Sequence, residues 1–108
     1  MIEITNKEEL LEILENSDAV LLYFGAINCS VCEVLKPKVE AEISKNFSKI
    51  EQIYINSSEN LEIASYFNVF SAPTILIFFQ GKEFKRYGRN ISLNIFNSEI
   101  KRLYEMVF

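Results

Sequence analysis

The 108-residue chain has no histidine and no tryptophan, and it has only two cysteines, two prolines and three glycines. So few glycines and prolines argue against a disordered or low-complexity chain. A mononuclear structural zinc site usually takes four cysteine or histidine ligands, which this chain alone does not supply. We therefore expect no metal site within one chain. A metal or cluster shared by two chains would need a dimer that nothing in the sequence predicts.

The chain also lacks a long apolar segment and a basic face. Its longest apolar run, residues 19–27, is well short of the roughly 20 residues that span a bilayer. The formal net charge of −4 argues against binding to nucleic acid and against attraction to anionic membranes. Residues 1–9 have neither the basic region nor the apolar region of a signal peptide. We therefore expect a cytoplasmic monomer with no nucleic-acid and no membrane partner.

The apolar residues that are present predict one α/β domain over residues 1–108. Two fully apolar runs, residues 19–25 and 74–79, are typical of strands that are buried on both faces of a sheet. Shorter patterns predict strands at 2–4, 50–55 and 82–87, and helices at 6–15, 29–45, 59–67 and after Ser92. This alternating order predicts a three-layer α/β/α sandwich, in which four helices flank a central mixed sheet of five strands.

The helix ends can also be predicted from local patterns. Thr5 stands three residues before Glu8, as in a capping box, and should begin the first helix. Residues 56–58 should cap the third helix and Ser92 the last one. Pro37 falls inside the second helix, where it should remove one backbone hydrogen bond and introduce a kink.

The two cysteines lie three residues apart, as Cys29-Ser30-Val31-Cys32, between an apolar strand and a helix. This pattern favours a redox dithiol, at the carboxyl end of a strand where open α/β sheets place their sites. The helix amino end should lower the pKa of the Cys29 thiol below its free value of about 8.5. We expect Cys29 to attack a partner disulfide and Cys32 to resolve the mixed disulfide. A purely structural disulfide is the alternative, but so small a loop stabilises little.

These features resemble the thioredoxin family over nearly the whole chain. Besides the strand and the cysteine pair, the resemblance rests on Pro37, on Phe70-Ser71-Ala72-Pro73-Thr74 before an apolar strand, and on Gly81 and Gly88. It implies a thioredoxin-like fold and a thiol–disulfide oxidoreductase that needs no cofactor beyond its own Cys29–Cys32 disulfide. The implied partners are disulfide-bearing protein or small-molecule substrates and a thioredoxin-reductase-type electron donor.

The resemblance also implies how a substrate binds. The Ala72–Pro73 bond would be cis, the backbone of Ala72 would pair with the bound substrate chain, and Pro73 would shield the two sulfurs. A proline that merely begins a strand is the alternative for Pro73. Asn28, Ser30 and Val31 complete the expected substrate-binding surface.

Several positions depart from the family pattern. Asn28 stands where thioredoxins usually have tryptophan, and Ser30-Val31 replaces Gly-Pro between the cysteines. We therefore do not assume the strongly reducing potential of ordinary thioredoxin.

Two further departures lie beneath the site. Tyr23 and Tyr54 stand where the family usually has a buried aspartate and its lysine partner. A tyrosine has a reference pKa near 10, so neither phenol is a ready base at neutral pH. Glu33, beside Cys32, is either a proton acceptor or a solvated first-turn residue that the helix dipole favours. Tyr23, Tyr54 and Glu33 are therefore candidate modulators of the cysteine pair.

A basic segment near the end of the chain has two interpretations. It consists of Lys82, Lys85, Arg86 and Arg89. These residues can guard an edge strand against pairing with other chains, which is the favoured interpretation, or they can dock a partner.

Two functions follow from the sequence as a whole. The retained cysteine pair favours a thiol–disulfide oxidoreductase. The departures from the family pattern leave room for a thioredoxin-fold binding module with weak or vestigial redox activity.

Overall fold

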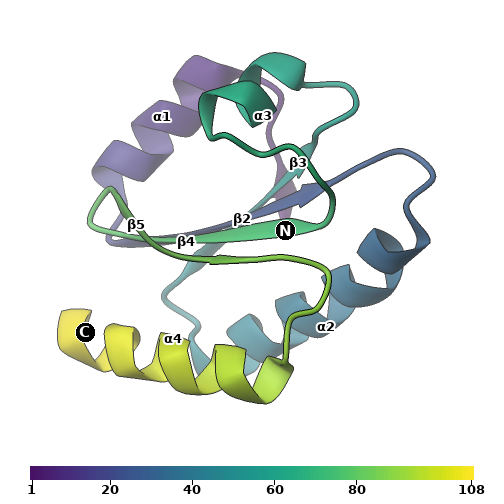
Figure 1. The fold of residues 1–108 in the computed structure, drawn as a ribbon. Helices are drawn as coiled ribbons and strands as arrows, with labels where there is room; N and C mark the ends of the chain where they lie inside the picture. Colours follow the sequence, from purple (N-terminus) through teal and green to yellow (C-terminus); the bar gives the residue numbers. More distant parts are fainter.

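The computed structural model describes all residues, 1–108, and has its strands and helices in the predicted order (Figure 1). The strands are β1 (Ile2–Glu3), β2 (Ala19–Gly25), β3 (Glu51–Asn56), β4 (Thr74–Phe79) and β5 (Lys82–Tyr87). The helices are α1 (Lys7–Asn16), α2 (Ser30–Asn46), α3 (Leu61–Tyr66) and α4 (Leu93–Val107). None of the helices is long and apolar enough to cross a membrane. The predicted α/β sandwich with a mixed five-stranded sheet is confirmed.

The sheet has the strand order β1-β3-β2-β4-β5, in which β1, β3 and β2 are parallel and β4 and β5 are antiparallel to their neighbours. Phe24, near the end of β2, pairs with Thr74 at the start of β4. The loop after β2 and the segment before β4 therefore lie at the same edge of the sheet. This register brings the cysteine pair and Pro73, which are distant in sequence, to one end of the molecule.

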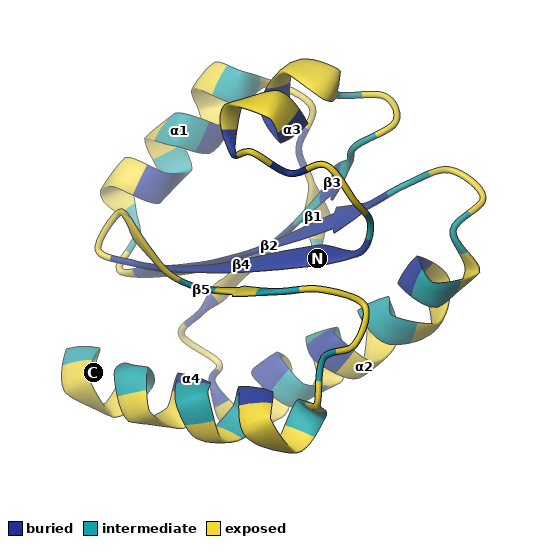
Figure 2. Ribbon diagram, in the orientation of Figure 1, coloured by how far each residue is buried: buried dark blue, intermediate teal, exposed yellow.

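Helices cover both faces of the sheet, as Figure 1 shows: α1 and α3 lie on one face, and α2 and α4 on the other. The central strands β2 and β4 are buried along their whole length (Figure 2). Alternate side chains of β2 point to opposite faces, so that Leu22 packs against α1 and α3 while Tyr23 packs against α2 and α4. Because both faces are covered, a strand must be apolar at every position, which is the pattern that the sequence shows.

The first helix begins one residue later than the capping-box pattern predicts. Asn6, and not Thr5, is the N-cap: its side-chain oxygen accepts a hydrogen bond from the backbone N–H of Glu9 at 2.8 Å. Asparagine is among the strongest N-cap residues and ranks above threonine. The prediction of Thr5 as the cap was therefore wrong, although the helix itself was predicted correctly.

The third helix is shorter than predicted, because the polar residues before it form a turn of their own. The side chain of Asn56 accepts a hydrogen bond from the backbone N–H of Ser58 at 3.0 Å, as in an Asx turn. Asn60 is the N-cap, and its amide donates to the carbonyl of Asn56 at 2.9 Å. Residues 56–58 therefore do not cap α3, and the predicted range of 59–67 contracts to Leu61–Tyr66.

The remaining boundaries differ little from the predicted ones. Ser92 caps α4, as predicted, and accepts a hydrogen bond from the backbone N–H of Ile95. The β4–β5 turn has positive φ angles at Gln80 (52°) and Gly81 (80°), which a two-residue hairpin of type I′ requires. Strand β5 is an edge strand, as the first interpretation of the basic segment expects.

Candidate active site

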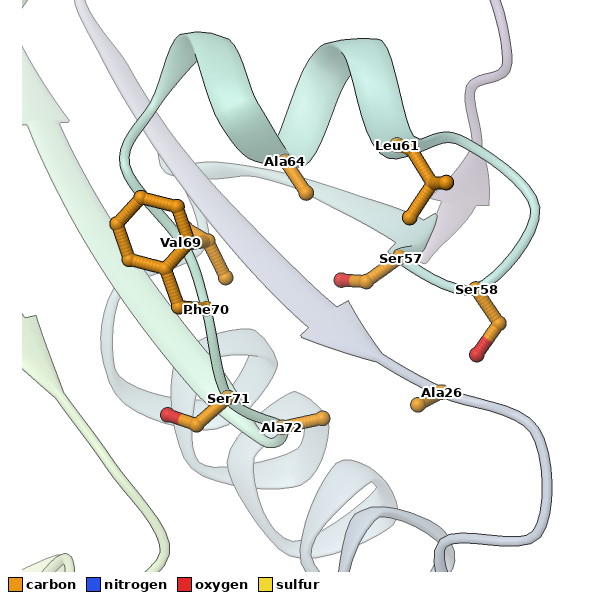
Figure 3. Close-up of a pocket in the computed structure, with 9 residues that line it drawn as sticks. All are labelled: Ala26, Ser57, Ser58, Leu61, Ala64, Val69, Phe70, Ser71 and Ala72. Carbon is orange, nitrogen blue, oxygen red and sulfur yellow. The ribbon is translucent and has the colours of Figure 1, made fainter.

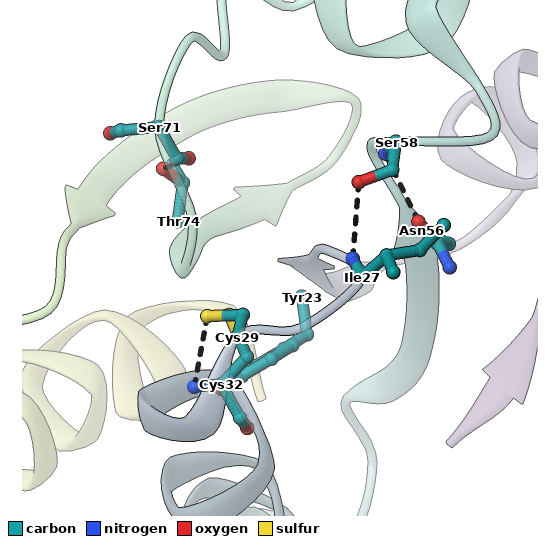
Figure 4. The surroundings of a disulfide bond; sticks show 8 residues. All are labelled: Tyr23, Ile27, Cys29, Cys32, Asn56, Ser58, Ser71 and Thr74. Atoms are coloured by element: carbon teal, nitrogen blue, oxygen red, sulfur yellow. Dashed lines mark hydrogen bonds between the residues drawn. A yellow bond between two sulfur atoms is a disulfide. The ribbon is translucent and has the colours of Figure 1, made fainter.

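The connection from β2 to α2 carries the first cysteine. Asn28 has a φ of 57°, in the left-handed region that asparagine adopts more readily than most residues. The backbone N–H of Ile27 donates to the hydroxyl of Ser58 at 3.1 Å, and the N–H of Ser57 donates to the carbonyl of Gly25 at 2.8 Å. The turn before α3 therefore holds the loop that positions Cys29 (Figure 4).

Cys29 is the N-cap residue of α2, so the helix begins at Ser30, one residue later than predicted. Its Sγ accepts a hydrogen bond from the backbone N–H of Cys32 at 3.2 Å (Figure 4). A helix N-cap is a position where unpaired N–H groups and the helix dipole stabilise negative charge. The sulfur that would become a thiolate therefore lies where an anion is favoured.

The two sulfurs form a disulfide, with the Cα atoms of Cys29 and Cys32 5.3 Å apart. The two cysteines differ in access to solvent. Cys29 is half-buried, whereas Cys32 is only 4% exposed and belongs to the core on the α2 side of the sheet. A partner can therefore approach Cys29 more readily than Cys32, as the sequence predicts.

Tyr23 lies beneath the cysteine pair and is fully buried. Its hydroxyl donates a hydrogen bond to the backbone carbonyl of Cys32 at 2.8 Å. Burial, with a smaller contribution from Tyr54, raises the pKa of Tyr23 to about 12. The phenol therefore keeps its proton at neutral pH and serves as a hydrogen-bond donor to the helix turn that carries Cys32.

Tyr54 is the neighbour of Tyr23 across the β2–β3 pair, with the ring centroids 6.1 Å apart. Burial is the main cause that raises its pKa. The ring fills the space beside Gly25: a Cβ atom on that glycine would lie 2.6 Å from the Tyr54 hydroxyl oxygen. The ammonium group of Lys36, a residue of α2, lies 5.4 Å from the centroid of the Tyr54 ring. The two phenols therefore form one packed layer under the disulfide.

Glu33 lies in the first turn of α2 and is exposed. This position favours the interpretation of Glu33 as a solvated residue at a helix amino end. Its carboxylate adds to the causes that raise the pKa of Tyr54. Ser30 is exposed and Val31 is half-buried, so the residues between the cysteines lie at the surface.

The segment before β4 forms the other side of the site. The Ala72–Pro73 bond is cis, as the family resemblance implies. Pro73 is buried and Ala72 is half-buried. The hydroxyl of Thr74 donates to the carbonyl of Ser71 at 2.7 Å, which holds the turn closed, and both residues lie near the disulfide in Figure 4.

A groove that sequence reasoning missed adjoins this segment (Figure 3). Its volume is about 370 Å³, and it runs from the β2–α2 loop across the turn before α3 to residues 69–72. Phe70 and Leu61 are 83% and 72% exposed, and no lining residue is charged. The groove forms because β3 lies beside β2, and this pairing cannot be read from the sequence. Only the aromatic residue of the Phe70-Ser71-Ala72-Pro73 motif could have indicated it.

The chemistry that this arrangement supports is the exchange of an electron pair between two thiols and a disulfide. The half-buried sulfur has a helix amino end to hold its charge, and the buried sulfur lies within bonding reach of it. Fold and site together therefore define a thiol–disulfide oxidoreductase.

Comparison with known proteins names the family. A family model described as Thioredoxin matches residues 1–102, and the chain belongs to the thioredoxin family. The chain is 28% identical over 109 residues to the thioredoxin-like protein YdfQ of Bacillus subtilis, covering 98% of this chain and 96% of the relative.

Two thioredoxins are also similar to the chain. A thioredoxin of Rickettsia bellii is 38% identical over 81 residues, which cover 74% of this chain and 76% of the relative. A solved structure of Plasmodium falciparum thioredoxin superposes with a TM-score of 0.78 at 26% identity, with complete coverage of both chains. The fold predicted from the sequence is therefore confirmed by solved structures as well.

Proposed function

We propose that this protein exchanges its Cys29–Cys32 pair with disulfide bonds of partner proteins, with Cys29 as the attacking sulfur. The observation that carries the proposal is the position of Cys29, which caps α2 and is the more accessible of the two sulfurs. A thiol in such an environment has an increased thiolate fraction, and the thiolate is the nucleophile of disulfide exchange.

In the reducing direction, the Cys29 thiolate attacks one sulfur of the partner disulfide. The partner S–S bond breaks, a mixed disulfide forms, and the other partner sulfur leaves with an electron pair and takes up a proton. Cys32 then loses its proton and attacks the Sγ of Cys29, which releases the second partner sulfur as a thiol. The partner has gained two electrons and two protons, and the chain returns to the disulfide state of the structure.

The partner would lie across the cysteine loop and the segment before β4. Asn28, Ser30 and Val31 would contact it from the α2 side, and the backbone of Ala72 would pair with its chain beside Pro73. Small-molecule disulfides would react at the same sulfur. A thioredoxin-reductase-type donor would return the pair to the dithiol state, and a reducing compartment such as the cytoplasm suits this cycle.

Reduction of insulin by dithiothreitol tests the proposal. We expect the protein to accelerate insulin reduction and the Cys29→Ser variant to lose all acceleration. The Cys32→Ser variant should form a mixed disulfide and stop there. Ser48→Ala, at an exposed position after α2, is the control and should match the unmodified protein. Retention of the full rate by Cys29→Ser would contradict the proposal.

A binding module with weak redox activity is the second candidate. The exposed Phe70 at the uncharged groove favours it, because an apolar partner segment could bind there without any exchange of disulfides. The two candidates differ in one result. A binding module would still bind its partner in the Cys29→Ser variant, and reduction of the Cys29–Cys32 disulfide would change that binding little.

A further inference from the structure

A second groove lies on the opposite side of the cysteine loop. It is lined by residues from the first turns of α2 and from the loop before α4, with a volume of about 290 Å³. We call it the cationic groove, and its lining residues are Ser30, Val31, Val34, Leu35, Lys38, Arg89 and Ile91. Because Ser30 and Val31 separate the two cysteines, anything that fills this groove lies next to the reactive sulfur.

The floor of the cationic groove is apolar and its two charges are both positive. Val34 is 58% exposed on α2, and Ile91 and Leu35 are half-buried beside it. Lys38 and Arg89 are exposed and are its only charged residues, so no carboxylate of the groove offsets them.

These two cations have no acidic partner within the chain, as is the case for most of its lysines and arginines. Lys7, Lys85 and Arg86 each pair with a glutamate, at distances of 3.0, 3.0 and 2.9 Å. Neither Lys38 nor Arg89 takes part in an ion pair within the chain. The structure therefore leaves two positive charges free at the edge of the active site, in a chain whose net charge is −4.

We propose that the cationic groove receives an acidic, partly apolar segment of the disulfide-bearing partner protein, next to the partner's cysteine. The inference rests on the proposed function and names a class of partner for the same site. The apolar floor takes a side chain of the segment, and Lys38 and Arg89 take carboxylates on either side of it. Charge complementarity of this kind raises the rate of encounter and fixes the orientation of the partner.

The uncharged groove beside Phe70, on the other side of the site, helps to assign the recognition of acidic segments to the cationic groove. No lining residue there is charged, so that groove does not discriminate between acidic and basic segments. Of the two grooves, only the one lined by Lys38 and Arg89 should therefore discriminate by charge. The net negative charge of the chain repels an acidic partner elsewhere, which directs it toward this side of the site.

The test compares two peptide disulfides that differ only in charge. Each peptide carries a leucine and one cysteine, with two glutamates in one version and two glutamines in the other. The fully reduced protein is mixed with each peptide disulfide, and the second-order rate constant is obtained by acid quench and thiol alkylation. We expect the acidic peptide to react about fivefold faster at low salt. The difference should disappear at about 0.5 M NaCl, where exposed charges are screened.

Two double variants with equal charge changes separate the groove from net charge. Lys38→Glu with Arg89→Glu should abolish or reverse the preference for the acidic peptide. Lys45→Glu with Arg102→Glu has the same charge change at exposed positions that do not line the cationic groove, and should keep most of the preference. Equal loss of preference in both double variants would overturn the inference.

Neutral and anionic small disulfides complete the test. Equal rates on the two peptides would overturn the inference and leave the proposed function intact, provided that hydroxyethyl disulfide is still reduced. Failure to reduce any of these disulfides would overturn the proposed function together with the inference. If oxidised glutathione depended on Lys38 and Arg89 as strongly as the acidic peptide does, the groove would bind a small disulfide, and the assignment to a protein partner would be wrong.

Discussion

The two faces of the sheet differ in chemistry, although the same strands build both. The core that faces α1 and α3 contains only aliphatic and phenylalanine side chains. The core that faces α2 and α4 contains both cysteines and four of the five tyrosines. One strand shows the difference directly: Leu22 and Phe24 of β2 point to the first face, and Tyr23 points to the second.

The difference shows how the fold separates stability from chemistry. On the α1 side, dry apolar packing supplies stabilisation in proportion to the buried area. On the α2 side, the tyrosines bring hydroxyl groups, and three of the four make a hydrogen bond. Tyr23 donates to Cys32, Tyr87 donates to Glu99, and Tyr104 accepts from the backbone N–H of Lys49. These hydrogen-bonded tyrosine hydroxyl groups are thus kept to one face of the sheet.

The largest expected effect is on the apolar face. Leu22 is fully buried, so Leu22→Ala should lower the free energy of unfolding by about 3 kcal/mol, measured in urea. The rate constant for disulfide exchange, measured on the folded protein, should stay within about twofold because Leu22 faces away from the cysteines. Leu22→Met preserves most of the volume and should cost less than about 1.5 kcal/mol. A tenfold loss of the exchange rate in folded Leu22→Ala would contradict the claim that the core facing α1 and α3 does not affect the chemistry of the cysteine pair.

The next effect concerns the stability of the site face at high pH. Burial raises the pKa of Tyr23 to about 12, above the unfolded value near 10. The contribution of Tyr23 to stability is therefore complete below pH 10 and is lost as the pH rises through 12. A shift of two units corresponds to roughly 2.7 kcal/mol.

We expect Tyr23→Phe to remove a part of the alkaline loss of stability. The oxidised protein should be used, because disulfide-bonded cysteines do not titrate. Unfolding free energies of the two proteins should converge between pH 10 and 12, with Tyr66→Phe as the variant at an exposed tyrosine. Parallel stability curves over this range would contradict the buried position of the Tyr23 phenol.

A smaller effect is expected at Gly25, where the site face is most crowded. A Cβ atom there would lie 2.6 Å from the Tyr54 hydroxyl oxygen and 2.8 Å from Cε1 of the same ring. Gly25→Ala should therefore displace the ring and lower the free energy of unfolding by about 1 to 2 kcal/mol. Tyr54→Ala in the same chain should make room and cancel the penalty of the Gly25 change in a double-mutant cycle.

Gly88 is the matched control for this prediction. A Cβ atom on Gly88 would meet nothing within 4 Å, so Gly88→Ala should change stability by less than about 0.5 kcal/mol. Equal effects of the two glycine substitutions would show that crowding against Tyr54 is not the cause.

The smallest effect is expected at the edge of the sheet. Lys85 on β5 pairs with Glu99 on α4 at 3.0 Å, with both side chains more than a third open to solvent. Such exposed ion pairs contribute little, so Lys85→Ala should cost at most about 0.5 kcal/mol. Lys82→Ala, on the same strand and without an ion pair, should cost nothing measurable. A loss above about 2 kcal/mol would show that the site face depends on this pair for its packing.

The sequence predicted the fold well because its strongest signals are local. The bounds of β2, β4 and β5 agree with the predicted strands, since each run ends at turn residues. Helix ends were less predictable because neighbouring polar side chains compete for the same backbone N–H groups. Asn6 displaced Thr5 as the cap of α1, and the Asx turn at Asn56 delayed the start of α3.

The site was predictable where it depends on neighbours in sequence and not where it depends on register. The position of Cys29 at a helix end follows from a strand, a short loop and a helix in succession. The contact between Gly25 and Tyr54 and the donation by Tyr23 to Cys32 depend on how strands and a helix meet in space. The two grooves arise in the same way, so their residues carry no common signal in the sequence.

The central claim, that Cys29 is the attacking sulfur, is tested most directly by trapping the mixed disulfide. The Cys32→Ser and Cys29→Ser variants are reduced and mixed with equal amounts of a peptide disulfide, and the adduct is followed by mass spectrometry. We predict that the adduct on Cys29, in Cys32→Ser, forms at least about tenfold faster than the adduct on Cys32, in Cys29→Ser. Equal rates, or a faster reaction at the buried Cys32, would contradict the account.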